Sequence, residues 1–261
     1  MRRFLVPLAL CLLWVEPASA TGFDQSHARW SAVLSHVVVP NGGVTRVRYG
    51  ELKRDPSALN AYLTDLSAVG LPEYQSWSRD EQAAFLVNAF NAFTLKFVAD
   101  HYPLKSIKDA GGLFKNAWTQ PFFRLLGEPR SLDWIRHDCL RAHFHDPRFS
   151  LALTLAARGG PSLAASAYTS TDLQAQLDRA ANQFLATPTG GRLDAASRRI
   201  LVSPLFSWYA VDFGEGDAGL RAFLKKRISA SDQDRKLLAD PKIPIRYLNF
   251  DWGLDDAPGP H

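Results

Sequence analysis

The segment 78–103, SRDEQAAFLVNAFNAFTLKFVADHYP, gives the clearest structural signal in the chain. Ser78 and Glu81 have the spacing of a capping box, in which each side chain bonds to the backbone of the other residue at a helix N-terminus. An apolar run follows from Ala83 to Val98 and ends before Pro103. The segment therefore predicts a helix that is buried on nearly all sides and lies at the centre of a packed domain.

The rest of the chain divides into further helices and short strands. Helices are expected at residues 24–37, 56–69, 131–140, 171–186, 203–213, 218–228 and 232–238. Strands are expected at residues 44–49, 122–126 and 243–250, with a hairpin through residues 194–197. Residues 149–156 alternate between large and small side chains, which is typical of a strand with one large-residue face and one small-residue face. Because helices dominate and do not alternate with strands as βαβ units, the sequence predicts an α+β fold: a single mixed, helix-rich domain with a small, mainly antiparallel sheet.

The N-terminal residues have the three parts of a secretory signal peptide. They are the charged start Met1-Arg2-Arg3, an apolar run from Phe4 to Trp14, and the sequence Ala18-Ser19-Ala20. We expect cleavage after Ala20, which leaves one globular domain over residues 21–261 with a core at about 80–253 and a disordered tail at 255–261. The apolar run is shorter than the roughly 20 residues that cross a bilayer. The expected product is a soluble, periplasmic or secreted protein with no membrane span after cleavage.

Charge and cysteine content narrow the classes of partner. The chain has 30 Lys and Arg against 26 Asp and Glu, a net charge of +4. This small and evenly spread excess argues against nucleic-acid binding but is compatible with an anionic small molecule or peptide. Of two cysteines, Cys11 lies in the signal peptide, so Cys139 has no partner for an internal disulfide.

Several segments resemble the domain-of-unknown-function family 547. They are FLVNAFNAFTL at 85–95, HYPLKSIKD at 101–109, SLDWIRH at 131–137, DPR at 146–148, AYT at 167–169, FSWYAVDF at 206–213 and YLNFDW at 247–252. The resemblance covers about residues 80–253 and implies no settled activity. Family members typically read Asn-Cys-Ala-Ser-x-Gly-Cys-Pro where this chain has TLAARGGP at 154–161, and glutamate where it has Arg136. The resemblance thus implies that any thiol chemistry of relatives is lost here.

His137 is the best catalytic candidate, because imidazole gives and takes protons near neutral pH and the residue lies in one of the resembling motifs. Asp133 precedes it by four residues on the same helix face and can orient the ring. Asp212 or Asp251 can approach from elsewhere in the fold. The alternative is a core histidine that is bonded to a backbone carbonyl.

The ligand-binding candidates are polar groups near the predicted central helix and the glycine-rich turn. Asn88 and Asn91 lie on nearly one face of the helix, where their amides either bind a ligand or tie a loop to the helix. Arg158 is followed by two glycines, so its guanidinium can hold a carboxylate or phosphate while backbone amides approach; the alternative is a surface arginine. The remaining ligand-binding candidates are Trp118, Tyr209, Asp251 and Trp252; the three aromatic residues are expected to form apolar walls of either the core or the cleft.

Two weaker patterns lead to no predicted site. Cys139 and His143, with His145 nearby, have the spacing of half a metal site, but Pro147 follows closely and a small buried cysteine explains Cys139 equally well. Ser162 weakly resembles a nucleophile elbow, yet only the terminal His261 follows it, so we interpret it as a loop residue. No metal and no cofactor are predicted.

Two functional hypotheses follow from these residues. In the first, the protein binds a small molecule or peptide without chemistry, which the missing cysteine pair favours. In the second, it is a thiol-independent hydrolase or acyl-transfer enzyme that uses His137 as acid and base. The position of His137 discriminates between them: a carboxylate partner in an open cleft favours the enzyme, and burial with only backbone partners opposes it.

Overall fold

The computed structural model describes residues 22–111 and 116–257, and its central element is the long helix that the sequence predicts. This helix, α5 (Arg79–His101), begins with a capping box, since Ser78 Oγ accepts from the Glu81 amide and Glu81 Oε2 accepts from the Ser78 amide at 2.7 Å. Nearly all of its residues from Ala83 to Ala99 are buried. The predicted central helix is confirmed.

The elements before and around α5 form the first of two hydrophobic cores. They are α1 (Ala28–Val37), β1 (Val38–Asn41), β2 (Val44–Val47), α2 (Tyr49–Arg54), α3 (Ser57–Ala68), α4 (Leu71–Ser76), η1 (Ile107–Gly111), β3 (Phe123–Leu125) and β4 (Glu128–Arg130). Helices α2 and α3 pack on α5, and α1 packs on α3. We call this the α5 core; Trp30, Tyr62, Phe85 and Phe90 are among its fully buried members.

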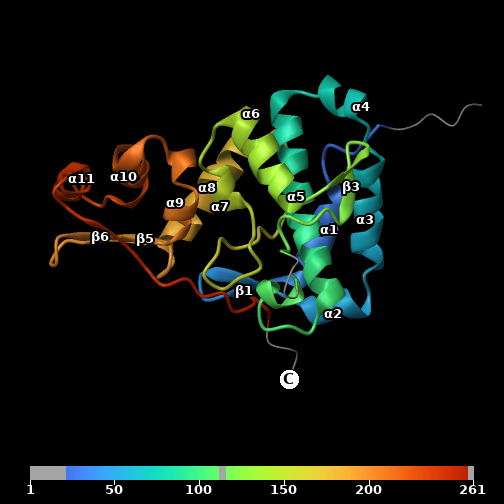
Figure 1. The fold of residues 1–261 in the computed structure, drawn as a ribbon, viewed down its shortest axis with the longest axis horizontal. Coiled ribbons are helices and arrows are strands. Elements are labelled where there is room, and N and C mark those ends of the chain that lie inside the picture. The colour runs from blue at the N-terminus through green and yellow to red at the C-terminus, as the bar shows by residue number, and fades with distance from the viewer. Residues whose placement is uncertain (1–21, 112–115, 258–261) are drawn as a thin grey trace, which may run out of the picture.

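The second core is built by the later part of the chain. Helices η2 (Trp134–Arg141) and α6 (Ala142–Phe144) still pack on the α5 core, and α7 (Phe149–Ala152) and α8 (Leu173–Ala186) contribute residues to both cores. The elements that belong to the second core alone are β5 (Gly191–Asp194), β6 (Arg199–Val202), α9 (Leu205–Trp208), η3 (Ala210–Phe213), α10 (Gly216–Ile228), α11 (Asp232–Ala239) and β7 (Ile245–Tyr247). We call it the α10 core; Phe184, Phe206 and Leu224 are buried in it. Figure 1 shows α10 and α11 at one end of the molecule and α1 and α3 at the other, with α6, α7 and α8 between them.

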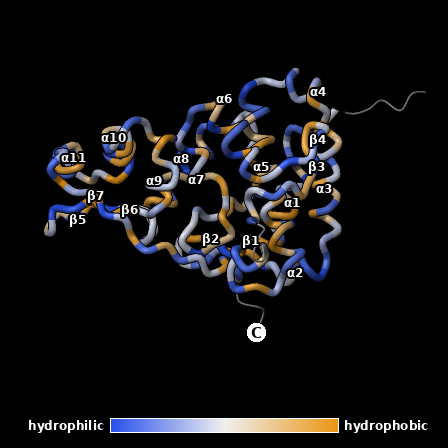
Figure 2. The backbone as a smooth tube through the Cα atoms, in the orientation of Figure 1, coloured by the Kyte–Doolittle hydropathy of each residue, from blue (hydrophilic) through white to orange (hydrophobic). Residues whose placement is uncertain are grey.

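The strands form small separate sheets. Strands β1 and β2 pair antiparallel, as do β3 and β4, and the three-stranded sheet β5-β6-β7 joins an antiparallel pair to a parallel one. The predicted helix-rich α+β fold with a mainly antiparallel sheet is confirmed. Figure 2 shows hydrophobic residues at both ends of the molecule, as two cores require. In the ranges that the structure describes, no helix has the length and hydropathy needed to cross a bilayer.

The predicted strand at residues 149–156 is wrong. Phe149–Ala152 is one helical turn, α7, and the residues after it form no ladder with a neighbouring strand. Both the large and the small side chains are buried, so the alternation does not separate a core face from a solvent face. The turn before this helix was readable, because Asp146 and Pro147 precede the N-cap Arg148 and Asp146 Oδ1 accepts from the Arg148 amide.

The expected disordered tail is also wrong for its first three residues. Asp255 is buried and accepts a hydrogen bond of 2.8 Å from the Tyr49 hydroxyl. Its carbonyl accepts from the Val47 amide, and the Ala257 amide donates to the Val47 carbonyl. In Figure 1 this final segment runs back from α11 to β1, so the end of the described chain completes the α5 core. Residues 258–261 and the expected signal peptide at 1–20 lie outside the described residues.

Candidate functional site

A cavity of about 440 Å³ lies where the two cores meet. This volume falls within the roughly 300–1,000 Å³ of small-molecule sites. One wall is apolar and comes mainly from the α5 core through Leu140, Phe149 and Leu153. The opposite wall comes from η3, which packs on α10, and contributes Val211 and Asp212. We call this space the junction cavity.

The π-helix η2 supplies the most unusual residue of the junction cavity. π-Helices are rare and often coincide with functional sites. Arg136, in the middle of η2, forms part of the cavity wall and is only 3% exposed. Its Nε, Nη1 and Nη2 are all shielded from solvent, and none has a hydrogen-bond partner among the described residues. The side chain is therefore a buried charge whose N–H groups are unsatisfied.

Two aromatic rings contact the Arg136 guanidinium without satisfying it. Its Cζ lies 5.0 Å from the Phe90 ring centroid and 4.5 Å from that of Tyr209. Each cation–π contact is worth about 2 kcal/mol when desolvated. The cost of burying an unpaired ion is several kcal/mol, and guanidinium does not deprotonate in proteins. The rings offset part of that cost, but they present no oxygen to the N–H donors.

Arg221 shows how the same chain satisfies a buried guanidinium. It is 7% exposed, and its Nη atoms donate to the carbonyls of Asp240 at 3.0 Å and Ile243 at 2.6 Å. Asp217 also lies 3.8 Å from it. Arg136 and Arg221 are thus equally buried but differ in that only Arg221 has oxygen partners.

The other cavity cation, Arg141, is neutralised within the protein. It forms a two-point ion pair with Asp212, in which Nε bonds Oδ1 and Nη2 lies 3.2 Å from Oδ2. Ser150 Oγ donates to the same Oδ2 at 2.6 Å. Asp212, which the sequence offered as a partner of His137, is therefore saturated by Arg141 and Ser150.

Both ring nitrogens of His137 face charged side chains. Arg141 Nη1 lies 2.6 Å from Nδ1, and Asp133 Oδ1 lies 3.6 Å from Nε2. Burial and the neighbouring Arg141 charge lower the pKa of His137 below its usual 6.5. The structure thus brings together the predicted pair His137 and Asp133, at the partly exposed surface of η2, but no nucleophile contacts the imidazole among the described residues.

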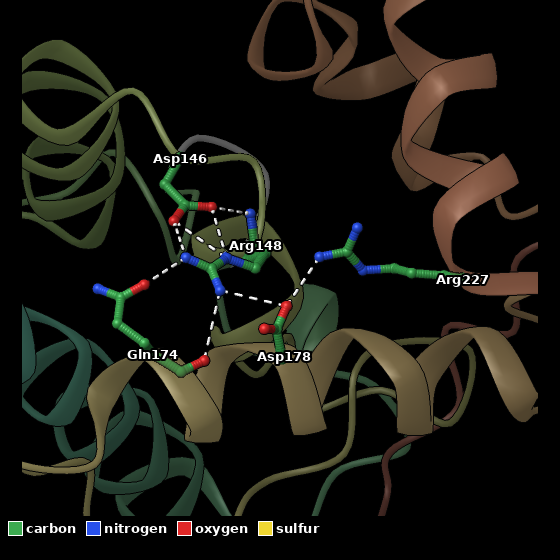
Figure 3. A network of polar contacts seen from close by, with 5 residues as sticks. All are labelled: Asp146, Arg148, Gln174, Asp178 and Arg227. Carbon is green, nitrogen blue, oxygen red and sulfur yellow. Dashed lines mark hydrogen bonds and ion pairs between the residues drawn. The ribbon is translucent and has the colours of Figure 1, made fainter.

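The rim of the junction cavity is held by an ion network that Figure 3 shows in close-up. Arg148 binds Asp146 through Nη2 at 2.6 Å and reaches α8 through the Gln174 side chain at 2.5 Å and Asp178 at 3.2 Å. Arg227 of α10 binds the same Asp178 oxygen at 2.9 Å. The network therefore joins the turn between α6 and α7 to α8 and α10.

His145 occupies this rim in a left-handed backbone conformation, with φ of 54°. Such a conformation costs a non-glycine residue about 1–2 kcal/mol, and strained residues of this kind cluster at binding sites. Asp146 follows directly and is clamped by Arg148, which holds the turn in place.

Asn88 and Asn91 do not face a ligand. The Asn88 amide donates to the Tyr168 carbonyl at 2.7 Å and accepts from the Tyr168 amide at 2.9 Å. Asn91 bonds in the same way to the Ala152 carbonyl and the Thr154 amide. Both side chains are fully buried and committed to loop backbones, so the loop-tying alternative is correct for both.

Arg158 is a surface arginine, which is the alternative that the sequence left open. Its guanidinium pairs with Asp251 at 3.1 Å on the surface, and it does not line the junction cavity. The Gly159 amide is taken by the Asp251 carbonyl at 2.9 Å. A Cβ on Gly159 would lie 2.7 Å from the Asp251 amide nitrogen, so the glycine allows the final chain segment to approach.

The predicted aromatic walls separate into two groups. Tyr209 lies at the Arg136 guanidinium and so contributes to the site. Trp252 instead stacks on Trp208 with centroids 5.4 Å apart and contacts Trp118 at 5.8 Å. This second group lies beside Asp251 and away from the residues that line the junction cavity. Trp118 and Trp252 pack against the α10 core, as the core alternative expects, and neither they nor Asp251 lines the junction cavity.

The weak metal and nucleophile patterns give no site. Burial raises the pKa of the Cys139 thiol to about 12, so it is no thiolate ligand. Ser162 Oγ accepts from the Thr45 amide and lies in a loop, as expected. Over residues 22–111 and 116–257, no group of three or more potential side-chain ligands is placed to hold a metal ion.

Sequence reasoning missed Arg136 and Ser150 as site residues. The adjacent His137 drew attention because of its chemistry, whereas an arginine in a mostly polar helix is typical of a solvated surface. A readable signal did exist: Arg136 lies one position after Ile135 and four before Leu140, both buried, so it falls beside the buried face of the helix.

The part of the chain that matches a known family includes the residues of the apolar wall of the junction cavity. Residues 74–185 match the model of a family described as a protein of unknown function, DUF547. The resemblance inferred from the sequence motifs is thereby confirmed over the matched segment, which includes η2 and α7 but not η3. No curated protein and no solved structure is significantly similar to the chain.

Proposed function

We propose that this protein is an exported binding protein that takes an anionic small molecule or the anionic group of a peptide in the junction cavity. The observation that supports this proposal most directly is the Arg136 guanidinium, which is buried and has no hydrogen-bond partner among the described residues. A permanent charge in a low-dielectric site is strongly destabilising unless an opposite charge reaches it. An anion that enters the cavity beside η2 supplies that charge.

The alternative is a thiol-independent hydrolase or acyl-transfer enzyme with His137 as acid and base. The observation in its favour is the Asp133 carboxylate 3.6 Å from Nε2. The observation against it is Arg141, which occupies Nδ1 at 2.6 Å and lowers the pKa of the ring. Because both nitrogens are engaged and no nucleophile contacts them among the described residues, the geometry favours binding.

A thermal-shift series tests the binding function. Carboxylates, phosphates and sulfates are added to the protein and to Arg136→Met and Arg158→Met, which each remove one arginine. We expect at least one anion to raise the melting temperature of the wild type and of Arg158→Met but not of Arg136→Met. Equal loss in both variants, or turnover abolished by His137→Ala, would contradict the proposal.

The proposed location is the periplasm or the exterior of the cell. It is supported by the sequence of residues 1–20, which has the order of a cleavable signal. Expression of the full chain with mass analysis of the exported fraction tests it. The expected product begins at Thr21; a full-length product retained in the cytoplasm would reject the proposed location without affecting the binding site.

A further inference from the structure

The charges around the junction cavity define the ligand more narrowly than the word anion does. Five titratable side chains line it: Arg136, Arg141, His145, Asp146 and Asp212. Arg141 and Asp212 neutralise each other, and Asp146 is neutralised by Arg148. Among the arginines and carboxylates of the lining, one positive charge is left over, and it is the Arg136 guanidinium.

A single uncompensated charge fits a ligand with a single negative charge. A phosphate monoester with two charges would bring one more negative charge than Arg136 can neutralise, and that charge would be left unpaired in the cavity. A carboxylate matches better, because its two oxygens accept paired N–H donors from one guanidinium. The donors that it would use are among the Nε, Nη1 and Nη2 that have no partner here; because these atoms are shielded from solvent in the free protein, side chains around the guanidinium must shift for the carboxylate to reach them.

The walls beyond these charges fit an apolar body. Leu140, Phe149 and Leu153 form one side of the cavity, and all three are buried in the α5 core. Val211 lies on the other side and is 69% exposed, the most exposed of the large hydrophobic residues described. Burial of apolar surface stabilises a complex, so an apolar ligand chain that covers Val211 adds affinity.

We infer that the junction cavity binds an amphiphilic monocarboxylate, with its carboxylate on Arg136 and its apolar body against Leu140, Phe149 and Val211. This inference rests on the proposed binding function and specifies its ligand class. It assigns the acid group and the apolar group to different walls. Each assignment is testable by removing one group from the ligand.

Isothermal titration with octanoate and three relatives tests the ligand class. Acetate lacks the chain, octanol lacks the charge, and octyl phosphate carries the second charge. We expect octanoate to bind the wild type at least about tenfold more tightly than each of the other three. Arg136→Met should lose octanoate binding, whereas Arg158→Met should keep it, since Arg158 lies outside the cavity.

A second variant keeps the test informative if Arg136→Met fails to fold. Val211→Asp alters an exposed side chain and places a carboxylate on the wall assigned to the apolar body. We expect it to weaken octanoate binding by at least about tenfold. Unchanged affinity would overturn the placement of the chain.

The outcomes separate the two levels of proposal. If acetate or octyl phosphate binds as tightly as octanoate and still depends on Arg136, the anion-binding function stands and the amphiphile is rejected. If no anion binds in an Arg136-dependent way, both are rejected. If octanol binds as well as octanoate, the cavity is an apolar site and the role of the charge is overturned.

Discussion

Replacing Arg136 with methionine should stabilise the ligand-free protein. Methionine is apolar and flexible, so it fills the space of the arginine stem without a charge. The change removes a buried ion whose desolvation costs several kcal/mol, and it forfeits two cation–π contacts worth about 2 kcal/mol each. We expect a net gain of about 1–3 kcal/mol in the free energy of unfolding, in the range found when buried ions are replaced by apolar residues.

Denaturation of the free protein measures this gain. For a chain of this size, about 1–3 kcal/mol corresponds to a rise in melting temperature of roughly 2–12 °C. Arg221→Met is the matched control, because Arg221 is equally buried but donates to the carbonyls of Asp240 and Ile243. It should destabilise by about 3 kcal/mol, since it leaves buried acceptors unpaired. If Arg136→Met destabilises as much as Arg221→Met, the guanidinium has partners in the free protein and the reasoning is refuted.

Adding ligand should reverse the order of stability. A ligand at a hundred times its Kd stabilises the folded state by about 2.7 kcal/mol, and only the wild type binds it. The wild type should thus be the less stable protein without octanoate and should reach or exceed the variant with it. A ligand-induced shift of the same size in both proteins would show that binding does not involve Arg136.

Three further predictions concern the scaffold around the site. Burial raises the pKa of Asp255 to about 6 and lowers that of His27 to about 4. The stabilisation of the folded state by the Asp255 carboxyl is lost as pH rises through 6, whereas the stabilisation by neutral His27 is lost as pH falls from 6.5 to 4. Asp255→Asn removes the first effect, so the free energy of unfolding of this variant should climb by roughly 3 kcal/mol between pH 4 and 6.5 in urea titrations. A flat profile would contradict this. Asn88→Ala should lower the free energy of unfolding by about 2–4 kcal/mol, because it leaves both backbone groups of Tyr168 unpaired, but it should leave the affinity for octanoate unchanged. If the variant folds fully and still loses octanoate affinity, Asn88 contacts the ligand. Arg148→Met should cost about 1–3 kcal/mol and speed amide hydrogen exchange at the turn between α6 and α7; unchanged exchange there would show that the network does not hold the rim.

The sequence predicted the elements whose signals are local. Helix α5 was readable because its capping box and its apolar run lie within one stretch of 26 residues. The hairpin of β5 and β6 was readable from the polar turn at residues 194–197. Alternation at residues 149–156 misled because burial on every side removes the contrast between two faces, which is the physical basis of the strand pattern.

The site could be predicted only in part, because the fold decides which charged side chains pair with one another. The pair His137 and Asp133 was predictable, since both lie on one helix. The lack of a hydrogen-bond partner for Arg136 was not predictable, because it depends on Asp212, which lies 76 positions further along the chain and bonds Arg141 instead. Arg158 shows the reverse case: its turn resembled an anion site until Asp251 occupied it.

The final described segment has a consequence for how the protein is made. Residues 254–257 supply hydrogen-bond partners to Val47 and Lys105 and place the Asp255 carboxyl on Tyr49. Residues around Val47 and Tyr49 are thus made early but receive their last contacts only when residues 254–257 are made. Since domains fold as their residues become available, the α5 core stays open until synthesis is nearly over. A ribosome-bound chain halted before residue 254 should consequently remain sensitive to protease around β2.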